Sequence, residues 1–266
     1  MSRITTVFNQ LGESGTKAFI PFITAGDSGL DNTYDLMQTL VDNGADIIEL
    51  GVPFSDPMAD GPMIAKSHER AVADGVSLHD VLDLVKKFRQ VNDTTAVVLM
   101  GYLNPIEVFG YQTFADAASK SGVDGVLVVD MPPEEAHDLK QCLDGVDIDF
   151  IFLVAPTTTN DRLAFLANVA SGFVYFVSLK GVTGAGHIDV DAVNANMARI
   201  RQFIDLPVGV GFGIKDAATA KAVSATADAV LVGASLVSFI EQYATDRDKM
   251  LTSVGPLSAE ISAAVK

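Results

Sequence analysis

Short apolar runs alternate with segments of helical spacing along the whole chain. The runs are rich in β-branched and aromatic residues, and they lie at 18–23, 46–51, 96–101, 124–129, 149–154, 173–178, 207–211 and 228–233. Between them lie segments with helical spacing of apolar residues, such as Leu78, Val81, Leu82, Val85 and Phe88, or Phe109, Phe114, Ala117 and Ala118. Strands that alternate with helices form parallel sheets, because parallel neighbours need a long crossover connection.

The number of these strand–helix units predicts the fold class. Eight units in 266 residues, with no linker or low-complexity segment between them, favour a closed (β/α)8 TIM barrel over an open doubly wound sheet, with residues 1–266 as a single domain. The first 12 residues predict an extra N-terminal helix that covers the barrel floor, and residues 236–266 predict a long final helical region. Three fragments repeat one device, a helix end that turns directly into a strand: Asn43-Gly-Ala-Asp46, Ser121-Gly-Val-Asp124 and Ala225-Thr-Ala-Asp228.

The second apolar run, 46–51, carries an acidic residue near its C-terminal end. Glu49 follows Ile47 and Ile48, and an ionised side chain buried there without a partner would cost several kcal/mol, so we expect Glu49 to have a chemical role. Asp56 and Asp60 follow in a loop that prolines and glycines keep irregular, and loops after strands are where sites are usually built. Asp56 fits a solvated loop position equally well.

Catalytic groups of a (β/α)8 barrel gather at the C-terminal ends of its strands. Period-two alternation places Ile47, Glu49 and Gly51 on one face of their strand. The residues at the strand ends then form a pocket that is apolar and aromatic, and that suits a flat hydrophobic substrate, although each apolar member also fits a plain core. The predicted pocket residues are Phe22, Thr24, Glu49, Met100, Tyr102, Leu127, Val129, Asp130, Tyr175 and Phe212.

Glycine clusters lie at the ends of the last three predicted strands, the first just after its strand and the other two closing theirs. They are Lys180-Gly-Val-Thr-Gly-Ala-Gly186, Gly209-Val-Gly-Phe-Gly213 and Gly233-Ala234-Ser235. Glycines let main-chain amides approach an anion closely, and the loops after strands seven and eight are a recurrent phosphate site of this barrel. The clusters therefore predict a phosphate site, with tight turns alone as the simpler alternative.

Five motifs together resemble one family. They are Pro21-Phe-Ile-Thr-Ala-Gly-Asp27, Ile48-Glu-Leu-Gly-Val-Pro-Phe-Ser-Asp-Pro-Met-Ala-Asp-Gly-Pro62, Met100-Gly-Tyr-Leu-Asn-Pro105, Ser178-Leu-Lys-Gly-Val-Thr-Gly184 and Val210-Gly-Phe-Gly-Ile214. They are similar to the tryptophan synthase alpha subunit family from the first strand to the last. The resemblance implies a lyase that cleaves indole-3-glycerol phosphate to indole and glyceraldehyde 3-phosphate. It also implies that the indole passes to a pyridoxal-phosphate beta subunit in an α2β2 assembly, and that this chain itself holds no cofactor.

The resemblance also assigns roles to individual residues. Glu49 and Asp60 match the catalytic acids, Glu49 as proton shuttle at the glycerol hydroxyl and C3, and Asp60 as acceptor of N1–H. Apolar neighbours should raise the pKa of Glu49, whereas polar partners should keep Asp60 ionised. The other matching positions are Tyr175 and Thr183, which support the acids, and Gly184 and Gly213, which bind phosphate.

Two positions depart from the family pattern. Many members carry an arginine where this chain has Leu179, so the loop after the sixth strand is expected to close with different contacts. The usual Gly-Ser pair of the phosphate site reads Gly233-Ala234 here, and the hydroxyl falls one position later, on Ser235. Ser235 is therefore not expected to reach the phosphate.

Charge and composition exclude several classes of protein. The net charge of −16, with 34 acids against 18 bases, argues against a nucleic-acid partner, although main-chain amides can still hold a small phosphate. The longest apolar stretches, 96–100 and 150–155, are far shorter than the roughly 18 residues of a membrane span. Cys142 is the only cysteine, which fits a reducing cytoplasm. The histidines, His68, His79, His137 and His187, are scattered, so we expect surface or capping positions for them and no metal site.

Three alternatives remain open at this point. The first is a stand-alone lyase that releases free indole. The second is a Schiff-base aldolase that uses Lys180, just past the sixth strand. The third is a non-catalytic activating subunit, against which the embedded acids Glu49 and Asp60 argue.

Overall fold

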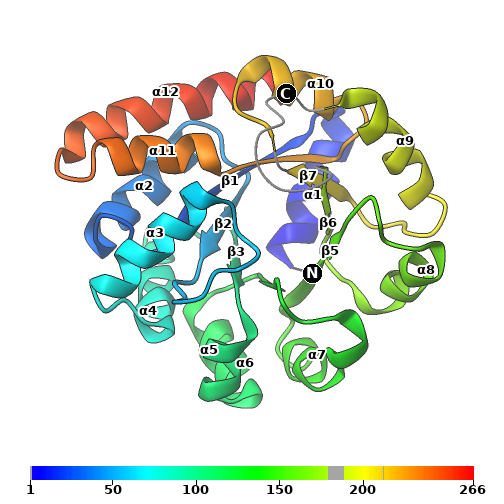
Figure 1. Ribbon diagram of the computed structural model, residues 1–266, viewed down its shortest axis with the longest axis horizontal. Helices are drawn as coiled ribbons and strands as arrows, with labels where there is room; N and C mark the ends of the chain where they lie inside the picture. Colours follow the sequence, from blue (N-terminus) through cyan, green and yellow to red (C-terminus); the bar gives the residue numbers. More distant parts are fainter. Residues whose placement is uncertain (1, 179–188, 212) are drawn as a thin grey trace.

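The eight apolar runs form the strands of one closed parallel barrel (Figure 1). The computed structural model describes residues 2–178, 189–211 and 213–266. Each strand pairs with the next in the chain, and β8 pairs with β1, so the predicted (β/α)8 barrel is confirmed. That residues 1–266 make up a single domain stays a prediction. The strands are β1 (Ala18–Thr24), β2 (Ile47–Gly51), β3 (Ala96–Gly101), β4 (Gly125–Val128), β5 (Asp149–Val154), β6 (Val174–Val177), β7 (Val208–Gly211) and β8 (Ala229–Val232).

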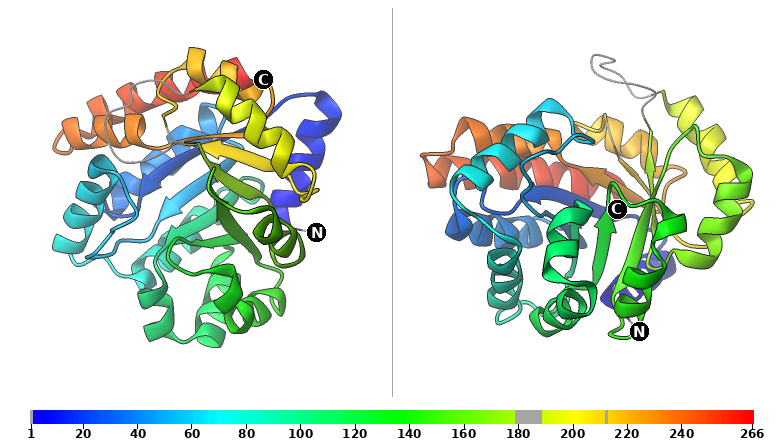
Figure 2. Two further views of the ribbon diagram at one scale, coloured as in Figure 1. Left: turned by 45° about the vertical axis from the view of Figure 1, so that its right-hand side comes forward. Right: turned by 60° about the horizontal axis from the view of Figure 1, so that its bottom comes forward.

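Helices surround the barrel and connect its strands (Figures 1 and 2). Among the described residues, no helix is both long and apolar enough to cross a membrane. The helices are α1 (Arg3–Ser14), α2 (Leu30–Asp42), α3 (Pro62–Ala73), α4 (Leu78–Phe88), α5 (Leu103–Phe109), α6 (Tyr111–Ser121), the 3-10 turn η1 (Pro133–Glu135), α7 (His137–Asp144), α8 (Asn160–Val169), α9 (Val190–Ile200), α10 (Ala217–Ser224), α11 (Ala234–Gln242) and α12 (Arg247–Val265).

The helical predictions hold with one correction. The spacing from Phe109 to Ala118 suggested one helix, but Phe109 ends α5 and Phe114 belongs to α6. Gly110 separates them at φ +83°, a left-handed conformation that glycine adopts without strain and that ends a helix. The final helical region is confirmed as two helices, α11 and α12.

Two apolar cores follow from the alternation along each strand. Ile48 and Leu50 belong to the core between barrel and helices, whereas Ile47 belongs to the core inside the barrel, as period two predicts. Ile4 of α1 is fully buried in the inner core, and the ring of Phe8 lies 5.8 Å from that of Phe173. The N-terminal helix therefore covers the barrel floor, as expected.

The repeated Asp at the start of three strands has a common structural role. Each carboxylate accepts a main-chain N–H from the preceding strand, and the same Asp donates its own N–H to the carbonyl of that residue. The pairs are Asp46 with Phe19 (2.8 and 3.0 Å), Asp124 with Val97 (2.8 and 2.9 Å) and Asp228 with Val208 (2.9 and 2.9 Å). These paired bonds fix the register of adjacent strands at the floor, because both bonds of each Asp go to the same residue of the neighbouring strand.

Replacing Asp124 with Ala is expected to destabilise the fold by about 3 kcal/mol or more. The buried carboxylate accepts from Val97 N–H at 2.8 Å, from Arg89 at 2.6 Å and from Arg3 at 2.9 Å, so its removal takes one acceptor from three donor groups. Urea unfolding measures the loss. Asp144→Ala is the matched control, since its surface ion pair with Lys140 should contribute less than about 1 kcal/mol. Equal losses in the two variants would contradict the role of Asp124.

Both ends of the chain are held at this floor. Arg3 donates to the carboxylate of Asp124, which precedes β4, and to the carbonyl of Asp93. Lys17 N–H donates to the carbonyl of Val265, and the ammonium of Lys266 lies 2.9 Å from Asp46. The first and last helices are thus anchored on the face opposite the strand C-termini.

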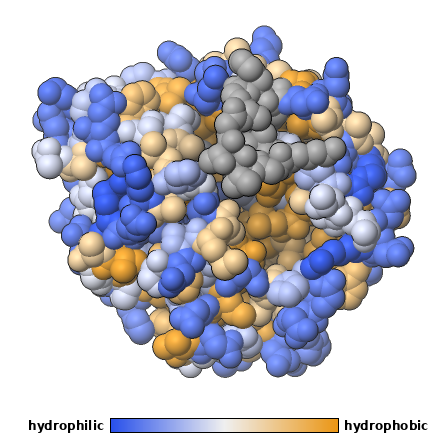
Figure 3. Space-filling model, in the orientation of Figure 1, coloured by the Kyte–Doolittle hydropathy of each residue, from blue (hydrophilic) through white to orange (hydrophobic). Residues whose placement is uncertain are grey.

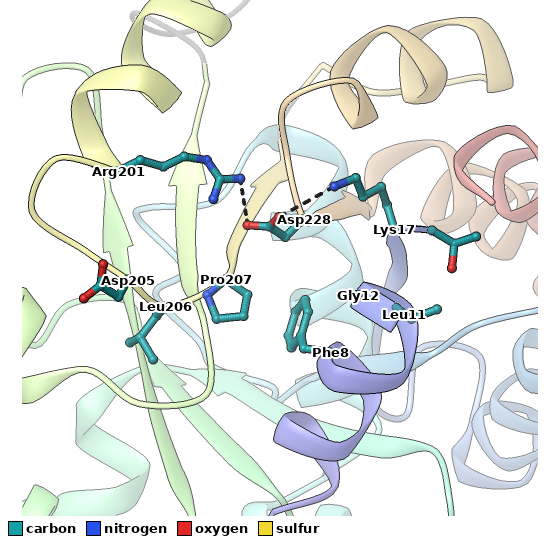
Figure 4. Close-up of a pocket in the computed structure, with 10 residues that line it drawn as sticks. Phe8, Leu11, Gly12, Lys17, Arg201, Asp205, Leu206, Pro207 and Asp228 are labelled. Atoms are coloured by element: carbon teal, nitrogen blue, oxygen red, sulfur yellow. Dashed lines mark hydrogen bonds and ion pairs between the residues drawn. The ribbon is translucent and has the colours of Figure 1, made fainter. Parts of the chain in front are cut away.

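A cavity of about 210 Å³ lies on the same floor, between α1 and the start of β7 (Figure 4). It is smaller than the roughly 300 Å³ of typical ligand pockets. Its two cations, Lys17 and Arg201, both pair with Asp228, at 3.7 and 2.9 Å. Lys17, Arg201 and Asp228 thus pair with one another, and the cavity is remote from the strand ends where a barrel builds its site.

Candidate active site

Glu49 is the most unusual side chain at the strand ends. It lies on β2 beside Phe22 of β1 and Val98 of β3, is 1% exposed, and its Oε1 has no hydrogen-bond partner among the described residues. Burial, reinforced by the charge of Asp60, raises the pKa of Glu49 to about 8. Glu49 therefore keeps its proton at neutral pH, as its apolar neighbours led us to expect.

Asp60 is held by a hydrogen-bond chain from its own loop. Tyr102 Oη donates to Asp60 Oδ2 at 2.7 Å and accepts the N–H of Ala59 at 3.0 Å. Burial raises the pKa of Asp60, and the Tyr102 bond opposes that shift. We expected polar partners to keep Asp60 ionised; Tyr102 is such a partner, but desolvation outweighs it, so the net shift in pKa is upward.

Tyr102 has a structural task that the sequence did not indicate. It was predicted as a pocket residue, and its hydroxyl is engaged with Asp60 while its ring stacks on Phe54 with centroids 5.0 Å apart. Burial raises the pKa of Tyr102 well above its usual range, so the hydroxyl remains a donor. Contact with a substrate stays a prediction for this residue.

His68 corrects the expectation of a surface or capping position. It lies on the buried face of α3 with Ser67 and Ala71 and is 2% exposed, with Nε2 3.7 Å from Asp60 Oδ2. Burial lowers the pKa of His68 to about 4, so the ring is neutral and the contact is no ion pair. The sequence signal was the position of His68 on a helix that begins two residues after Asp60.

The other histidines differ from His68. His79 is exposed and stacks on Phe109 at 4.3 Å, and His137 is exposed at the start of α7, which agrees with surface positions. His187 lies outside the described residues. Among the described residues, no group of three His, Cys, Asp or Glu side chains is arranged to hold a metal ion.

The predicted apolar wall is partly assembled. Met100, Leu127, Val129 and Tyr175 belong together to the core inside the barrel. Phe212 lies outside the described residues. On the face shown in Figure 3, apolar side chains gather near the centre, over the barrel, with hydrophilic residues around them.

Phe22 and Tyr175 occupy space that neighbouring glycines leave free. A Cβ at Gly51 would lie 2.7 Å from Phe22 Cζ, and a Cβ at Gly211 would collide with the hydroxyl of Tyr175. Burial, and then the charges of Glu49 and Asp60, raise the pKa of Tyr175 well above its usual range. The phenol is thus a neutral neighbour of both acids. Thr183, the other predicted supporting residue, lies outside the described residues.

The predicted phosphate positions lie at the ends of β7 and β8. Gly233 caps α11 without a side-chain bond, and Ala234 and Ser235 are the first two residues of that helix, whose N-terminus favours anions. The buried Ser235 Oγ has no partner among the described residues. Gly213 adopts φ +78°, a conformation that suits glycine. Gly184, like Leu179 and Lys180, lies outside the described residues.

Comparison with known proteins assigns the family. The family model described as "Tryptophan synthase alpha chain" matches residues 8–266. The chain is 73% identical to the tryptophan synthase alpha chain of Ruthia magnifica subsp. Calyptogena magnifica, with 100% of both chains covered. The crystal structure of tryptophan synthase subunit alpha from Legionella pneumophila str. Paris is similar with a TM-score of 0.93 and 39% identity, covering 100% of this chain and 98% of that one.

A structure of an assembled complex is also similar. The crystal structure of the tryptophan synthase complex from Pyrococcus furiosus matches with a TM-score of 0.82 and 35% identity, covering 93% of this chain and 99% of that one. The family match spans nearly the whole chain, and the relatives are covered almost completely. On these grounds, the chain belongs to the family of tryptophan synthase alpha chains.

Proposed function

We propose that this chain, as an alpha subunit, is a lyase that cleaves indole-3-glycerol phosphate by a retro-aldol reaction into indole and glyceraldehyde 3-phosphate. One observation carries the proposal: Glu49 is buried and keeps its proton at neutral pH, and it lies close enough to Asp60 for the Asp60 charge to raise its pKa. Acid–base chemistry on an indole requires such a pair of acids, and the proposal gives Glu49 the role of proton donor and Asp60 that of the anion.

The reaction needs the indole ring to take up electrons. Glu49 donates its proton to C3, which places positive charge on the ring, and the Asp60 carboxylate stabilises that charge at N1–H and accepts the proton. The Glu49 carboxylate then removes the proton of the glycerol hydroxyl. The C–C bond then breaks and gives the aldehyde. The electron pair of that bond moves into the ring, Asp60 returns its proton to N1, and the aromatic indole is restored. Both acids end in the states in which they began.

The remaining predicted residues bind the two ends of the substrate. The apolar wall of Met100, Leu127 and Val129 suits the flat indole. Gly213, Gly233 and Ala234 suit the phosphate, since helix α11 begins there. Ser235 joins this proposed set against the expectation from its shifted position, because its buried Oγ has no protein partner among the described residues. Phe22 lies beside Gly233, because a Cβ placed at Gly233 would be 3.3 Å from Phe22 Cδ1. The proposal puts Phe22 between the indole end and the phosphate end of the substrate. Thr183, Gly184 and Phe212 complete the proposed set from the resemblance alone.

The test is a cleavage assay on indole-3-glycerol phosphate. Indole is followed by chromatography, and glyceraldehyde 3-phosphate is followed with a coupled NAD-dependent dehydrogenase. Both products in equal amounts are expected, and neither product from a folded chain would contradict the function. Borohydride should trap no adduct on the chain; a trapped adduct at Lys180 would instead favour the Schiff-base aldolase.

The proposed partner is a pyridoxal-phosphate beta subunit, in an α2β2 assembly in the cytoplasm that joins the indole to serine. This chain itself then needs no cofactor. Its surface beside the proposed active site supports such a partner: Met58 in the loop of Asp60 is 89% exposed, and Val108 on α5 is 82% exposed. The main-chain N–H of Ala59 in that loop donates to Tyr102 Oη, which in turn donates to the Asp60 carboxylate. A partner that docks on the loop can therefore move the carboxylate.

Asp56→Ala is expected to weaken activation by the partner more than basal cleavage. Asp56 is exposed in the same loop, and its carboxylate accepts from the hydroxyl of Ser55. Adding the beta subunit of the same organism should raise wild-type turnover by orders of magnitude, and the variant should show a smaller increase. Asp83→Ala, on the exposed face of α4, is the control that should behave like wild type. A wild-type chain that is fast alone and unaffected by the beta subunit would favour the stand-alone lyase.

A further inference from the structure

His68 connects the loop of Asp60 to the carboxylate of Asp60 itself. It lies on α3, the helix that follows this loop. Its Nδ1 accepts the main-chain N–H of Phe54 at 3.2 Å, and its Nε2 lies 3.7 Å from Asp60 Oδ2. Its ring also meets the edge of the Tyr102 ring, with centroids 6.4 Å apart at 81°. One imidazole therefore touches the start of the loop, its end, and the tyrosine that holds Asp60.

The bond from Phe54 determines which ring nitrogen carries the proton. A nitrogen that accepts an N–H bond has none, so the neutral imidazole has its proton on Nε2. Burial lowers the pKa of His68 to about 4, which keeps the ring neutral under ordinary conditions. The Nε2–H group consequently faces the Asp60 carboxylate as a dipole and not as a charge.

Asp60 depends on neutral donors for its stabilisation. Four described titratable groups act on or near it: Glu49 from β2, Tyr175 from β6, Tyr102 after β3 and His68 from α3. None of these four is positively charged at neutral pH, and burial favours the protonated acid. Tyr102 supplies one hydrogen bond at 2.7 Å. The Nε2–H of His68 faces the same carboxylate at 3.7 Å, outside hydrogen-bond range, and a movement of about 0.5 Å would bring it within range as a second donor.

We propose that His68 is a positioning residue for Asp60: its Nε2–H orients the carboxylate and favours its anionic form, while its Nδ1 ties that orientation to the loop at Phe54. The inference rests on the proposed function, since it gives Asp60 the work of accepting the indole N1–H. His68 acts through Asp60 and has no assigned contact with substrate. Its loss should therefore lower turnover and leave substrate binding largely intact.

The first test compares His68→Leu with His68→Gln in the full chain. Leu removes both ring contacts, whereas the Gln side-chain amide keeps an N–H donor at the distance of Nε2. We expect kcat to fall about tenfold or more in His68→Leu with KM changed less than about threefold, and to stay within about threefold of wild type in His68→Gln. The acidic limb of the pH–rate profile should move to higher pH in His68→Leu, because Asp60 loses a donor that favours its anion.

His79→Gln is the matched control, since His79 is an exposed histidine stacked on Phe109. It should leave both kcat and the acidic limb unchanged. Wild-type kcat with an unmoved acidic limb in His68→Leu would overturn the inference. So would an equal loss in His68→Leu and His68→Gln, because that result would mean that packing and not the donor is what matters.

The second test uses the wild-type chain and holds even where His68→Leu does not fold. Imidazole ¹⁵N chemical shifts, assigned by comparison with His68→Gln, should show a proton on Nε2, none on Nδ1, and no titration between pH 5.5 and 8. A proton on Nδ1, or titration in that range, would overturn the inference. If the wild-type chain does not cleave indole-3-glycerol phosphate, the proposed function fails, whereas these shifts still report on the contact between His68 and Asp60.

Discussion

Glu49→Gln is expected to abolish cleavage of indole-3-glycerol phosphate while the chain stays folded. The amide keeps the shape of the side chain in its apolar surroundings and cannot pass a proton between the glycerol hydroxyl and C3. Loss of a general acid–base group typically lowers the rate by about 10²–10⁴-fold. Turnover above a few per cent of wild type, measured with saturating substrate, would contradict this role for Glu49.

The pH dependence provides an independent check on Glu49. With a pKa of about 8, the side chain loses its proton as the pH rises through 8, and the proposed mechanism requires that proton for C3, so wild-type kcat/KM should fall there. In the unfolded chain the same carboxyl ionises near its ordinary value of 4.5, which means that the folded state loses stability progressively between pH 4.5 and 8. Glu49→Gln removes this cost, and urea unfolding at pH 8 should find the variant at least as stable as wild type. A less stable variant would show that the carboxyl has an unseen structural partner.

Asp60→Asn is the second substitution with a large expected effect. The Asn side-chain oxygen can still accept from Tyr102, but it offers no negative charge to the indole N1–H. We expect a loss of about 10²-fold or more in kcat, comparable to the removal of one preorganised charge-stabilising group. Binding of glycerol 3-phosphate, which has no indole, should be unchanged.

Asp56→Asn is the matched control for the charge of Asp60, because it makes the same chemical change in the same loop at an exposed position. Its basal cleavage, measured without a partner, should equal that of wild type. If both Asn variants lose activity equally and mildly, Asp60 is an ordinary loop acid and the mechanism proposed for it is wrong.

The barrel could be predicted because its signals are local. Apolar runs such as 46–51 and 96–101 mark strands buried on both faces, and every strand boundary in the structure lies within one residue of the predicted one. Glu49 was equally visible, since a single acid inside an apolar run is a local anomaly. The one wrong helix spanned Gly110, where the apolar spacing continues through a backbone turn.

The surroundings of Asp60 could not be predicted in the same way. Tyr102 is 42 residues from Asp60 along the chain and reaches it only because β2 and β3 are neighbours in the closed barrel. The burial of His68 depends on which side of α3 packs inward, and its tautomer depends on a main-chain N–H 14 residues earlier. The upward pKa shift of Asp60 arises from the balance of desolvation against one hydroxyl, and that balance exists only in the folded protein.

The anchoring of both chain ends at the barrel floor bears on how this protein can be handled and joined to others. Arg3 and Lys266 are fixed near the starts of the strands, whereas Glu49, Asp60 and the exposed Met58 are grouped at the other ends of the strands. A purification tag, a fluorescent protein or a linker to a solid support, fused at either end, would leave the proposed active site and the proposed partner surface open to solution. Sensor chips coated in this way would present every molecule in the same orientation, with the side that receives ligand facing the flow.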